Sequence, residues 1–434
     1  MHNSVGIRLK IAVISDLHLG AKWGTEREED SFDQAREAFE RAVALGAKLI
    51  LVPGDIFEFR IPRQEILAKA MKILSVPQSA DTSGLKLSDT IDKSRGDISS
   101  ALFRGIPVVA LHGNHERRSA GLVNPVQALE AAGLLIHLHH NSVVFSTRPR
   151  RVAIHGMSNV PERHAFNVFE TWKPKPVEGA FNVLMLHQSL GKYVYSSKEN
   201  PTIELPDLPP GFDLYVCGHI HYCGETEIHG KPLIFPGSTI RTQLIPIEAD
   251  RPKGFYMVNL GSNVTLEFVE LESVRDFHYE EKTFEGASIN DIERYVRTRV
   301  REILDGARRN SEKIPLIKFR LRGSLARDAS RSDFDIEMLQ REFRDQAIVT
   351  IGKSELASPG LEEKVKLLRE LREQRISIEE MGMELLDSNL KDMGFDHQID
   401  VHAIYGLLVE DRFDEALELV ISAAKKMAEK GESE

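Results

Sequence analysis

Five short apolar segments, each followed by polar side chains, constrain this chain more than any other feature. The segments and the residues after them are 11–14 with Asp16 and His18, 49–52 with Asp55, 106–111 with Asn114 and His115, 183–186 with His187, and 214–216 with His219 and His221. Short apolar runs bounded by polar residues are typical of buried strands. Side chains at the carboxyl ends of strands gather at one edge of an α/β sheet. The pattern therefore predicts an α/β fold in which these residues form one site.

The chemistry of this set indicates a metal site. Asp, Asn and His offer oxygen and imidazole donors without thiolate, which suits Mn²⁺, Fe²⁺ or Zn²⁺. Leaving His115 aside, the donors are too many for one ion, whereas two ions ~3.5–4 Å apart that share a carboxylate would use them all. Asp55 is the natural bridge. The competing interpretation, ordinary buried histidines, would have to explain all five strand ends together.

Length and composition set the wider frame. A chain of 434 residues with 41% hydrophobic content predicts two or three domains. The formal net charge of -10 means that any nucleic-acid binding must use local basic patches or a partner. Cys217 and Cys223 are too few for a disulfide framework and are expected to be small buried residues in a reducing compartment. No apolar run approaches the ~18 residues that span a bilayer, so we expect a soluble intracellular protein.

Periodicity predicts helices over 31–45, 62–76 and 124–133 in the first part of the chain. The polar stretch 77–100 has little periodicity and reads as a surface loop or a disordered insertion. Three histidines follow the third helix: His137, His139 and His140. They invite a metal interpretation, but no carboxylate stands at matching spacing, so a surface loop is preferred.

A second block begins near residue 273. Ser288 starts an amphipathic helix that has an apolar stripe and, next to it, a basic stripe. Over 317–322 apolar and basic residues alternate, which predicts a strand. The cations of the two elements are Arg294, Arg297, Arg301, Lys318, Arg320 and Arg322. They indicate either solvated faces or a small α+β domain that presents a basic surface to a phosphate backbone.

The C-terminal part is charged and helical. We expect a linker over 357–397 that contains an amphipathic helix from Leu361, and a helical hairpin formed by 401–408 and 413–427. A hairpin this small cannot bury a sufficient core alone. From the residues alone, docking on the protein's own body and docking on a partner are equally good interpretations.

The motifs resemble a known superfamily. Asp16-x-His18, Gly54-Asp55, Gly113-Asn114-His115-Glu116, His187 and Gly218-His219-x-His221 stand in the order of the five motifs of the calcineurin-like metallophosphoesterases. Over about the first 270 residues the chain is similar to the DNA double-strand-break repair nucleases of the meiotic recombination eleven family, called SbcD in bacteria. The details that carry this closer resemblance are Leu17, Leu19 and Gly20, Ile56 and Phe57, and the turn 236–239 with Arg241.

The resemblance implies a fold and a division of the chain. It implies a two-sheet metallophosphoesterase sandwich flanked by helices over 1–272, a small α+β DNA-binding capping domain over 273–356, a linker over 357–397, and a helical hairpin over 398–434. The hairpin would bind an SMC-like coiled-coil ATPase of the Rad-fifty/SbcC type. The resemblance therefore favours docking of the hairpin on a partner over docking on the protein's own body. A homodimer is expected, through helices in 62–76 and 124–133. The compact length resembles archaeal members, so the protein would be cytoplasmic, prokaryotic and nucleoid-associated.

The resemblance also implies roles. Asp16, His18 and His221 would hold one Mn²⁺, Asn114, His187 and His219 a second, and Asp55 would bridge them. His115 would act on the leaving group without binding metal.

Two departures from the family pattern matter. Glu116 stands where the superfamily usually has Asp, which keeps a carboxylate available to orient His115. Glu58 stands where some relatives carry a second His, which puts exonuclease strength in doubt. The stretch 77–100 is also longer than expected of the family.

The function this implies is a Mn²⁺-dependent endonuclease and 3′–5′ exonuclease that processes double-strand-break ends and hairpins in complex with the ATPase. Two alternatives stay open: a phosphoesterase for small molecules, and chiefly a scaffold that tethers DNA ends.

Overall fold

The computed structural model describes residues 9–119, 121–147, 150–196, 199–261, 264–306, 312–327, 329–358, 378–392 and 400–431. They divide into two compact units. The first comprises the described parts of Met1–Tyr279, Gly306–Lys318 and Asp345–Ile348, and the second those of Glu280–Asp305, Phe319–Arg344 and Val349–Glu434.

The first unit contains two sheets. One has the order β13-β12-β1-β2-β4-β5, and β1, β2, β4 and β5 are parallel. Its strands are β1 (Leu9–Val13), β2 (Leu49–Val52), β4 (Val108–Ala110), β5 (Ile136–His137), β12 (Gly254–Leu260) and β13 (Val264–Glu270). The other has the order β10-β11-β9-β8-β7-β6-β3, and β7, β8, β9 and β11 are parallel. Its strands are β3 (Lys86–Ile91), β6 (Asn141–Thr147), β7 (Arg150–Met157), β8 (Phe181–His187), β9 (Leu214–Gly218), β10 (Gly224–Ile228) and β11 (Lys231–Phe235).

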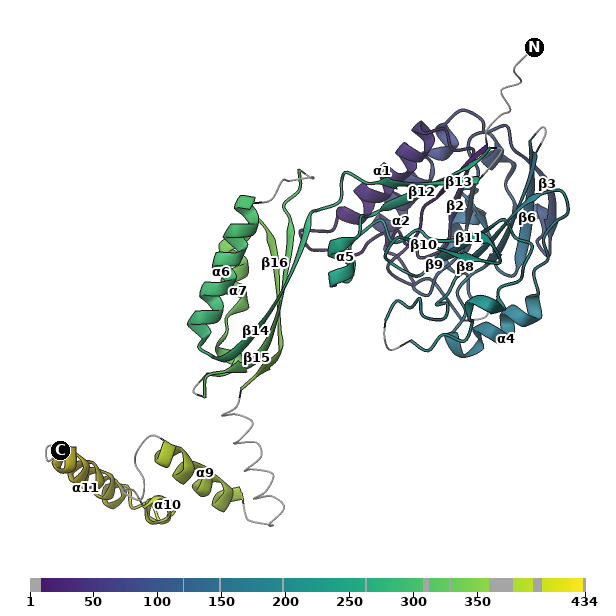
Figure 1. The fold of residues 1–434 in the computed structure, drawn as a ribbon. Coiled ribbons are helices and arrows are strands. Elements are labelled where there is room, and N and C mark those ends of the chain that lie inside the picture. The colour runs from purple at the N-terminus through teal and green to yellow at the C-terminus, as the bar shows by residue number, and fades with distance from the viewer. Residues whose placement is uncertain are drawn as a thin grey trace. The chain divides into compact units, whose positions relative to one another are not determined.

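Three apolar layers hold this unit together. A middle core takes side chains from both sheets, such as Val13 and Leu51 from the first and Val183 and Val216 from the second. Two outer cores lie under the helices (Figure 1). The helices α1 (Asp30–Ala44), α2 (Gln64–Leu74) and α3 (Pro125–Ala131) cover the first sheet, and α4 (Glu162–Trp172) covers the second. Short helical elements complete the unit: α5 (Pro246–Asp250), η1 (Pro77–Ser79), η2 (Arg95–Asp97), η3 (Ser100–Phe103) and η4 (Leu205–Asp207). The predicted two-sheet sandwich flanked by helices is confirmed.

Two local predictions were wrong. The stretch 77–100 is not a loop throughout, because β3 pairs with β6 as an edge strand of the second sheet. Most of its side chains are exposed, so the sequence of this strand shows no alternation of apolar and polar residues. His137 does not lie in a surface loop: it belongs to β5 and is 6% exposed, because the segment forms the last strand of the first sheet.

The second unit is built around a three-stranded sheet with the order β14-β15-β16. Its elements are β14 (Phe277–Ala287), β15 (Leu316–Leu325), β16 (Ile348–Ala357), α6 (Ile289–Gly306), α7 (Ile336–Phe343) and η5 (Arg331–Asp333). Figure 1 shows α6 and α7 on one face of this sheet. Phe319 and Leu321 are buried, while the alternate side chains of β15 are only half-buried, which confirms the predicted period of two.

The C-terminal helices are α9 (Ile378–Asp392), α10 (Val401–Val409) and α11 (Phe413–Gly431). The last two confirm the predicted helical pair, which a turn at Glu410 and Asp411 joins. The amphipathic helix expected from Leu361 lies outside the described residues as far as position 377, and the division of the chain into four domains stays a prediction. Among the helices that the structure describes, none is long and apolar enough to cross a membrane.

Candidate metal centre

Sharp turns directly after the strands aim the site residues inward. Asp16, His18, Asp55 and His219 have left-handed backbones with φ of 50°, 45°, 47° and 77°. Residues other than glycine adopt this region at a cost of order 1–3 kcal/mol, and they do so most often at functional sites. In these turns the chain changes direction directly after the strand, so the side chains of the turn residues lie over the strand ends.

Glycine makes the closest approach possible. Gly54 has φ +110°, and a Cβ built on it would lie 2.1 Å from Nδ1 of His187. The Gly-Asp pair at the end of β2 therefore has a steric reason: only a residue without a side chain lets the imidazole of His187 lie against this turn.

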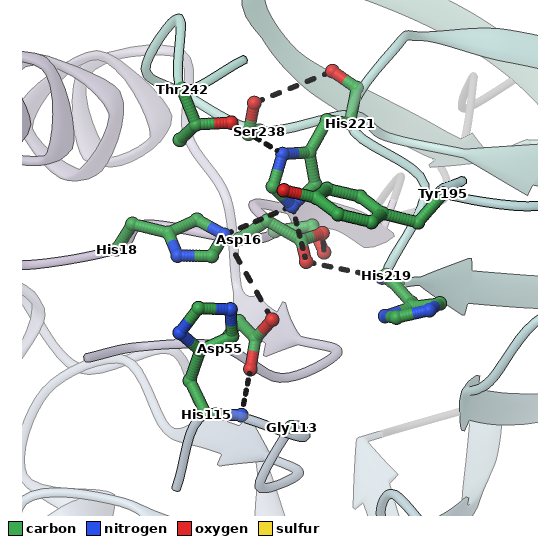
Figure 2. A network of polar contacts seen from close by, with 12 residues as sticks. Asp16, His18, Asp55, Gly113, His115, Tyr195, His219, His221, Ser238 and Thr242 are labelled. Carbon is green, nitrogen blue, oxygen red and sulfur yellow. Dashed lines mark hydrogen bonds and ion pairs between the residues drawn. The ribbon is translucent and has the colours of Figure 1, made fainter. Parts of the chain in front are cut away.

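The first cluster consists of Asp16, His18, Asp55 and His221. All four are buried and offer donor atoms that lie within 4.8 Å of one another. Nε2 of His18 lies 3.0 Å from Nε2 of His221, and 3.8 Å from Oδ2 of Asp55. Figure 2 shows the two rings and the two carboxylates converging on one point.

The second cluster consists of Asp55, His187 and His219, whose donor atoms also lie within 4.8 Å of one another. Asn114 completes it, because its Oδ1 is 3.3 Å from Nε2 of His187 and 3.1 Å from Nδ1 of His219. Asp55 thus belongs to both clusters. Its Oδ2 is buried and has no hydrogen-bond partner within the described part of the chain.

Each of the four histidines is held from behind by an acceptor on its outer nitrogen. The contacts are His18 Nδ1 to Glu58 Oε2 at 2.8 Å, His187 Nδ1 to the Pro53 carbonyl at 2.6 Å, His219 Nε2 to Glu199 Oε1 at 3.1 Å, and His221 Nδ1 to Thr242 Oγ1 at 2.7 Å. Such contacts fix the tautomer and leave the inner nitrogen with a free electron pair that can bind a metal ion, as is usual for metal-bound histidines.

The electrostatics of the centre suit a cation. Burial alone would raise the pKa of Asp55, but the charges of His187 and His18 lower it well below its usual range. Burial alone would lower the pKa of His187, but Asp55 raises it to about 9. Asp55 and His187 therefore favour each other's charged forms, and a divalent cation beside Asp55 would supply the positive charge that the proton on His187 supplies here.

His115 lies beside this centre. It is half-exposed, its ring stands edge-on to His18 at 4.9 Å, and its backbone N–H donates to Oδ1 of Asp55. Its Nδ1 is 2.8 Å from the carbonyl oxygen of Glu58. A carbonyl can only accept, so Nδ1 carries a proton and Nε2 remains to exchange one.

Glu116 does not orient His115, contrary to expectation. Its buried carboxylate accepts hydrogen bonds from the backbone N–H groups of Phe57 and Gly113 instead. Burial and the charge of Asp55 raise the pKa of Glu116 to about 8. Glu116 therefore ties together the two turns that carry the predicted ligands Asp55 and Asn114, while the carbonyl oxygen of Glu58 contacts Nδ1 of His115.

The residues present fit a divalent metal. Buried oxygen and imidazole donors converge, one carboxylate oxygen is left without a partner, and the outer nitrogens are fixed. All seven residues predicted as ligands come together at the strand ends of both sheets. Sequence reasoning missed Glu199, Thr242 and the Pro53 carbonyl, because a single acceptor in a loop leaves no local signal.

The cations predicted to bind DNA lie on α6 and β15, and most of them are paired. Arg294 pairs with Asp291, Arg297 with Glu293 and Glu342, Arg301 with Glu342, and Arg320 and Arg322 with Glu281 and Glu355. Lys318 is half-buried on β15. Acidic side chains therefore lie among the arginines of the basic stripes. The sequence pattern did not reveal this pairing.

Comparisons with known proteins agree with this geometry. Residues 9–223 match the family model described as calcineurin-like phosphoesterase. The chain is 28% identical over 293 residues to the DNA double-strand break repair protein Mre11 of Methanopyrus kandleri, covering 62% of this chain and 58% of that one. It is 28% identical over 323 residues to the double-strand break repair protein MRE11 of Encephalitozoon cuniculi, covering 69% and 54%. The corresponding protein of Arabidopsis thaliana is 24% identical over 436 residues, covering 88% and 59%.

The chain thus spans between 54% and 59% of the length of these three relatives. The match begins with β1 and includes every strand end that carries a predicted ligand. Residues 9–223 thus form a calcineurin-like phosphoesterase domain, and the chain is a homologue of the Mre11 double-strand break repair proteins.

Proposed function

We propose that this protein is a Mn²⁺-dependent DNA nuclease, with endonuclease and 3′–5′ exonuclease activity, that processes double-strand-break ends and hairpins. The observation that carries the proposal is the sharing of Asp55 between two donor clusters. Two cations bridged by one carboxylate are the usual apparatus for in-line phosphodiester hydrolysis. The relatives named as double-strand break repair proteins support DNA as the substrate.

In this proposal two Mn²⁺ ions share the site. Asp16, His18 and His221 would hold the first, Asn114, His187 and His219 would hold the second, and Asp55 would serve both. When bound, the ions polarise the phosphodiester and lower the pKa of the attacking water. The protein supplies the preorganisation, because its buried donors are already fixed from behind.

His115 acts on the leaving group. With Nδ1 fixed by the Glu58 carbonyl, Nε2 is the nitrogen that can donate a proton to the departing sugar oxygen. The carboxylate of Glu58 lies 3.9 Å from Nδ1 of His115. Glu58 would thus support His115 in this chain.

Helix α6 and strand β15 would contact DNA through Lys318 and the arginine stripes. DNA phosphates would have to replace the carboxylates that now pair with these arginines. This part of the proposal therefore rests on exchange of ion pairs and not on free positive charge.

Partners complete the proposal. A homodimer is supported by exposed apolar residues just before α2 and α3: Phe59, Ile61, Leu122 and Val123 are 47%, 70%, 53% and 64% exposed. The apolar stripes of these helices face the core instead, with Ile66 and Leu129 fully buried. The SMC-like ATPase would bind α10 and α11, and the protein would act at the nucleoid of a prokaryotic cell.

The test compares the wild type with His115→Ala on linear duplex and hairpin DNA in Mn²⁺, with and without chelator, beside a chromogenic phosphomonoester. DNA cleavage that is lost with chelator and falls by about 10²–10⁴-fold in the variant would support the nuclease and its proton donor. Fast monoester turnover with intact DNA would favour a small-molecule phosphoesterase instead. DNA binding without any turnover, also with the ATPase added, would favour a tethering scaffold.

A further inference from the structure

Glu199 lies outside both donor clusters but touches one of their members. Its Oε1 is 3.1 Å from Nε2 of His219. The other nitrogen of that ring, Nδ1, is 3.1 Å from Oδ1 of Asn114. The imidazole therefore separates the two: Asn114 is on the cluster side and Glu199 is behind the ring.

The carboxylate of Glu199 is itself held in place. Its Oε2 accepts a hydrogen bond from the hydroxyl of Ser189 and another, at 3.1 Å, from the backbone N–H of Tyr195. The ring centroid of Tyr195 lies 5.6 Å from that of His219 and 4.6 Å from that of His221. Figure 2 shows these three residues in the same network. One carboxylate thus joins the segment after β8 to a predicted ligand.

The four histidines differ in what stands behind them. His187 and His221 contact neutral oxygens, whereas His18 and His219 each contact a carboxylate. Each donor cluster therefore contains one histidine with a carboxylate behind it. A carboxylate in this position orients the ring and makes its inner nitrogen a stronger donor than a neutral acceptor does.

We propose that Glu199 is a positioning residue for the second metal site, and that it sets the metal affinity of this site separately from the first. The proposal rests on the proposed function, because it assumes that Asn114, His187 and His219 hold a cation. Glu199 does not touch the cation or the substrate: it acts through His219. Loss of such a carboxylate typically weakens metal affinity about 10- to 100-fold.

The experiment titrates the full-length, metal-free protein with Mn²⁺ and follows the free ion by electron paramagnetic resonance. We expect two bound ions in the wild type. In Glu199→Ala one of the two should bind about 10- to 100-fold more weakly while the other is unchanged, and Glu199→Gln, whose amide oxygen still accepts, should show a smaller loss. Co²⁺ absorption spectra provide a second readout, because ligand geometry at one of two ions should change.

Two controls isolate the contact to His219. Glu204→Gln removes a carboxylate from the same segment. The contacts of Glu204 are to Asp207 in its own turn, so both affinities should stay as in the wild type. Ser189→Ala removes a bond to Glu199 but keeps the contact to His219, so it should weaken the second site less than Glu199→Ala does.

Equal weakening of both sites, unchanged affinities in Glu199→Ala, or an equal loss in Ser189→Ala would overturn the proposal. A wild type that binds no Mn²⁺ would instead overturn the proposed function, so the two failures are distinguishable.

Discussion

At the scale of single residues, steric fit around Gly54 is the sharpest constraint on the centre. In Gly54→Ala the new Cβ would overlap Nδ1 of His187, and the backbone would stay strained at φ +110°. We expect the free energy of unfolding to fall by at least about 2 kcal/mol and the second metal site to weaken. Urea denaturation and Mn²⁺ titration measure the two effects.

Gly84 provides the matched control for this prediction. It also has positive φ, +73°, but a Cβ there would meet no atom within 4 Å. Gly84→Ala should therefore show only the conformational cost, about 1 kcal/mol, and normal metal binding. Equal losses in the two variants would show that contact with His187 is not the cause.

A second constraint at this scale is the neutral state of His137. Burial, with smaller effects of His139 and Lys93, lowers the pKa of His137 to about 3. In the unfolded chain the pKa of histidine is about 6.5, so below that pH the unfolded state binds a proton that the folded state does not. Stability contributed by the neutral ring is present above pH 6.5 and is lost as the pH falls towards 3.

The expected loss from His137 alone between pH 7 and pH 5 is about 2 kcal/mol. In His137→Gln the difference in urea midpoint between these two pH values should shrink accordingly. His164→Gln, at an exposed histidine, should leave the difference as in the wild type. The same pH dependence in all three proteins would contradict the assignment.

At the scale of elements, the sequence predicted the strands that are buried on both faces and missed the exposed edge strand. Leu49 to Val52 form a fully buried strand, so their apolar run is a direct signal of β2. The edge strand β3 has no such run, because it pairs with β6 only and most of its side chains are exposed. The residues proposed as ligands could be predicted because they follow buried strands. Glu199 and Thr242 could not, because they contact His219 and His221 from loops whose positions depend on the whole fold.

The basic stripes show the same limit. Arg320 and Arg322 alternate correctly on β15, but their partner Glu355 stands on β16, more than thirty residues away in the sequence. Cross-strand pairing of this kind is set by sheet topology. The sequence therefore predicted the face of the strand and not its net charge.

These pairs allow a test of the DNA surface. Glu355→Gln leaves Arg320 and Arg322 with one carboxylate fewer, so binding to duplex DNA should tighten and the slope of log affinity against log salt should steepen by about 1. Fluorescence anisotropy between 50 and 200 mM salt, a range of about half a decade, measures this. Glu337→Gln, at an exposed position of α7, makes the same change in net charge and should have a smaller effect. Identical slopes in both variants would remove this face from the DNA-binding proposal.

At the scale of the whole molecule, the two C-terminal helices expose several large apolar side chains. Val409, Phe413 and Leu417 are 65%, 59% and 58% exposed. Large uncovered apolar patches mark interaction sites. A helical pair with such a surface fits the apolar face of a coiled coil, as the proposed ATPase partner would supply.

Leu417→Glu tests this interface without disturbing the metal centre. The side chain is exposed on α11, so helix content by circular dichroism and Mn²⁺-dependent cleavage by the protein alone should be unchanged. Affinity for the ATPase should fall by at least about tenfold, because a charge would be buried in an apolar contact. Glu418→Gln, next to it on the same helix, should bind as the wild type does. Because the chain carries a net charge of -10, a loss that disappears at high salt would point to electrostatic repulsion between the chains, and a loss that persists would place Leu417 in the apolar interface itself.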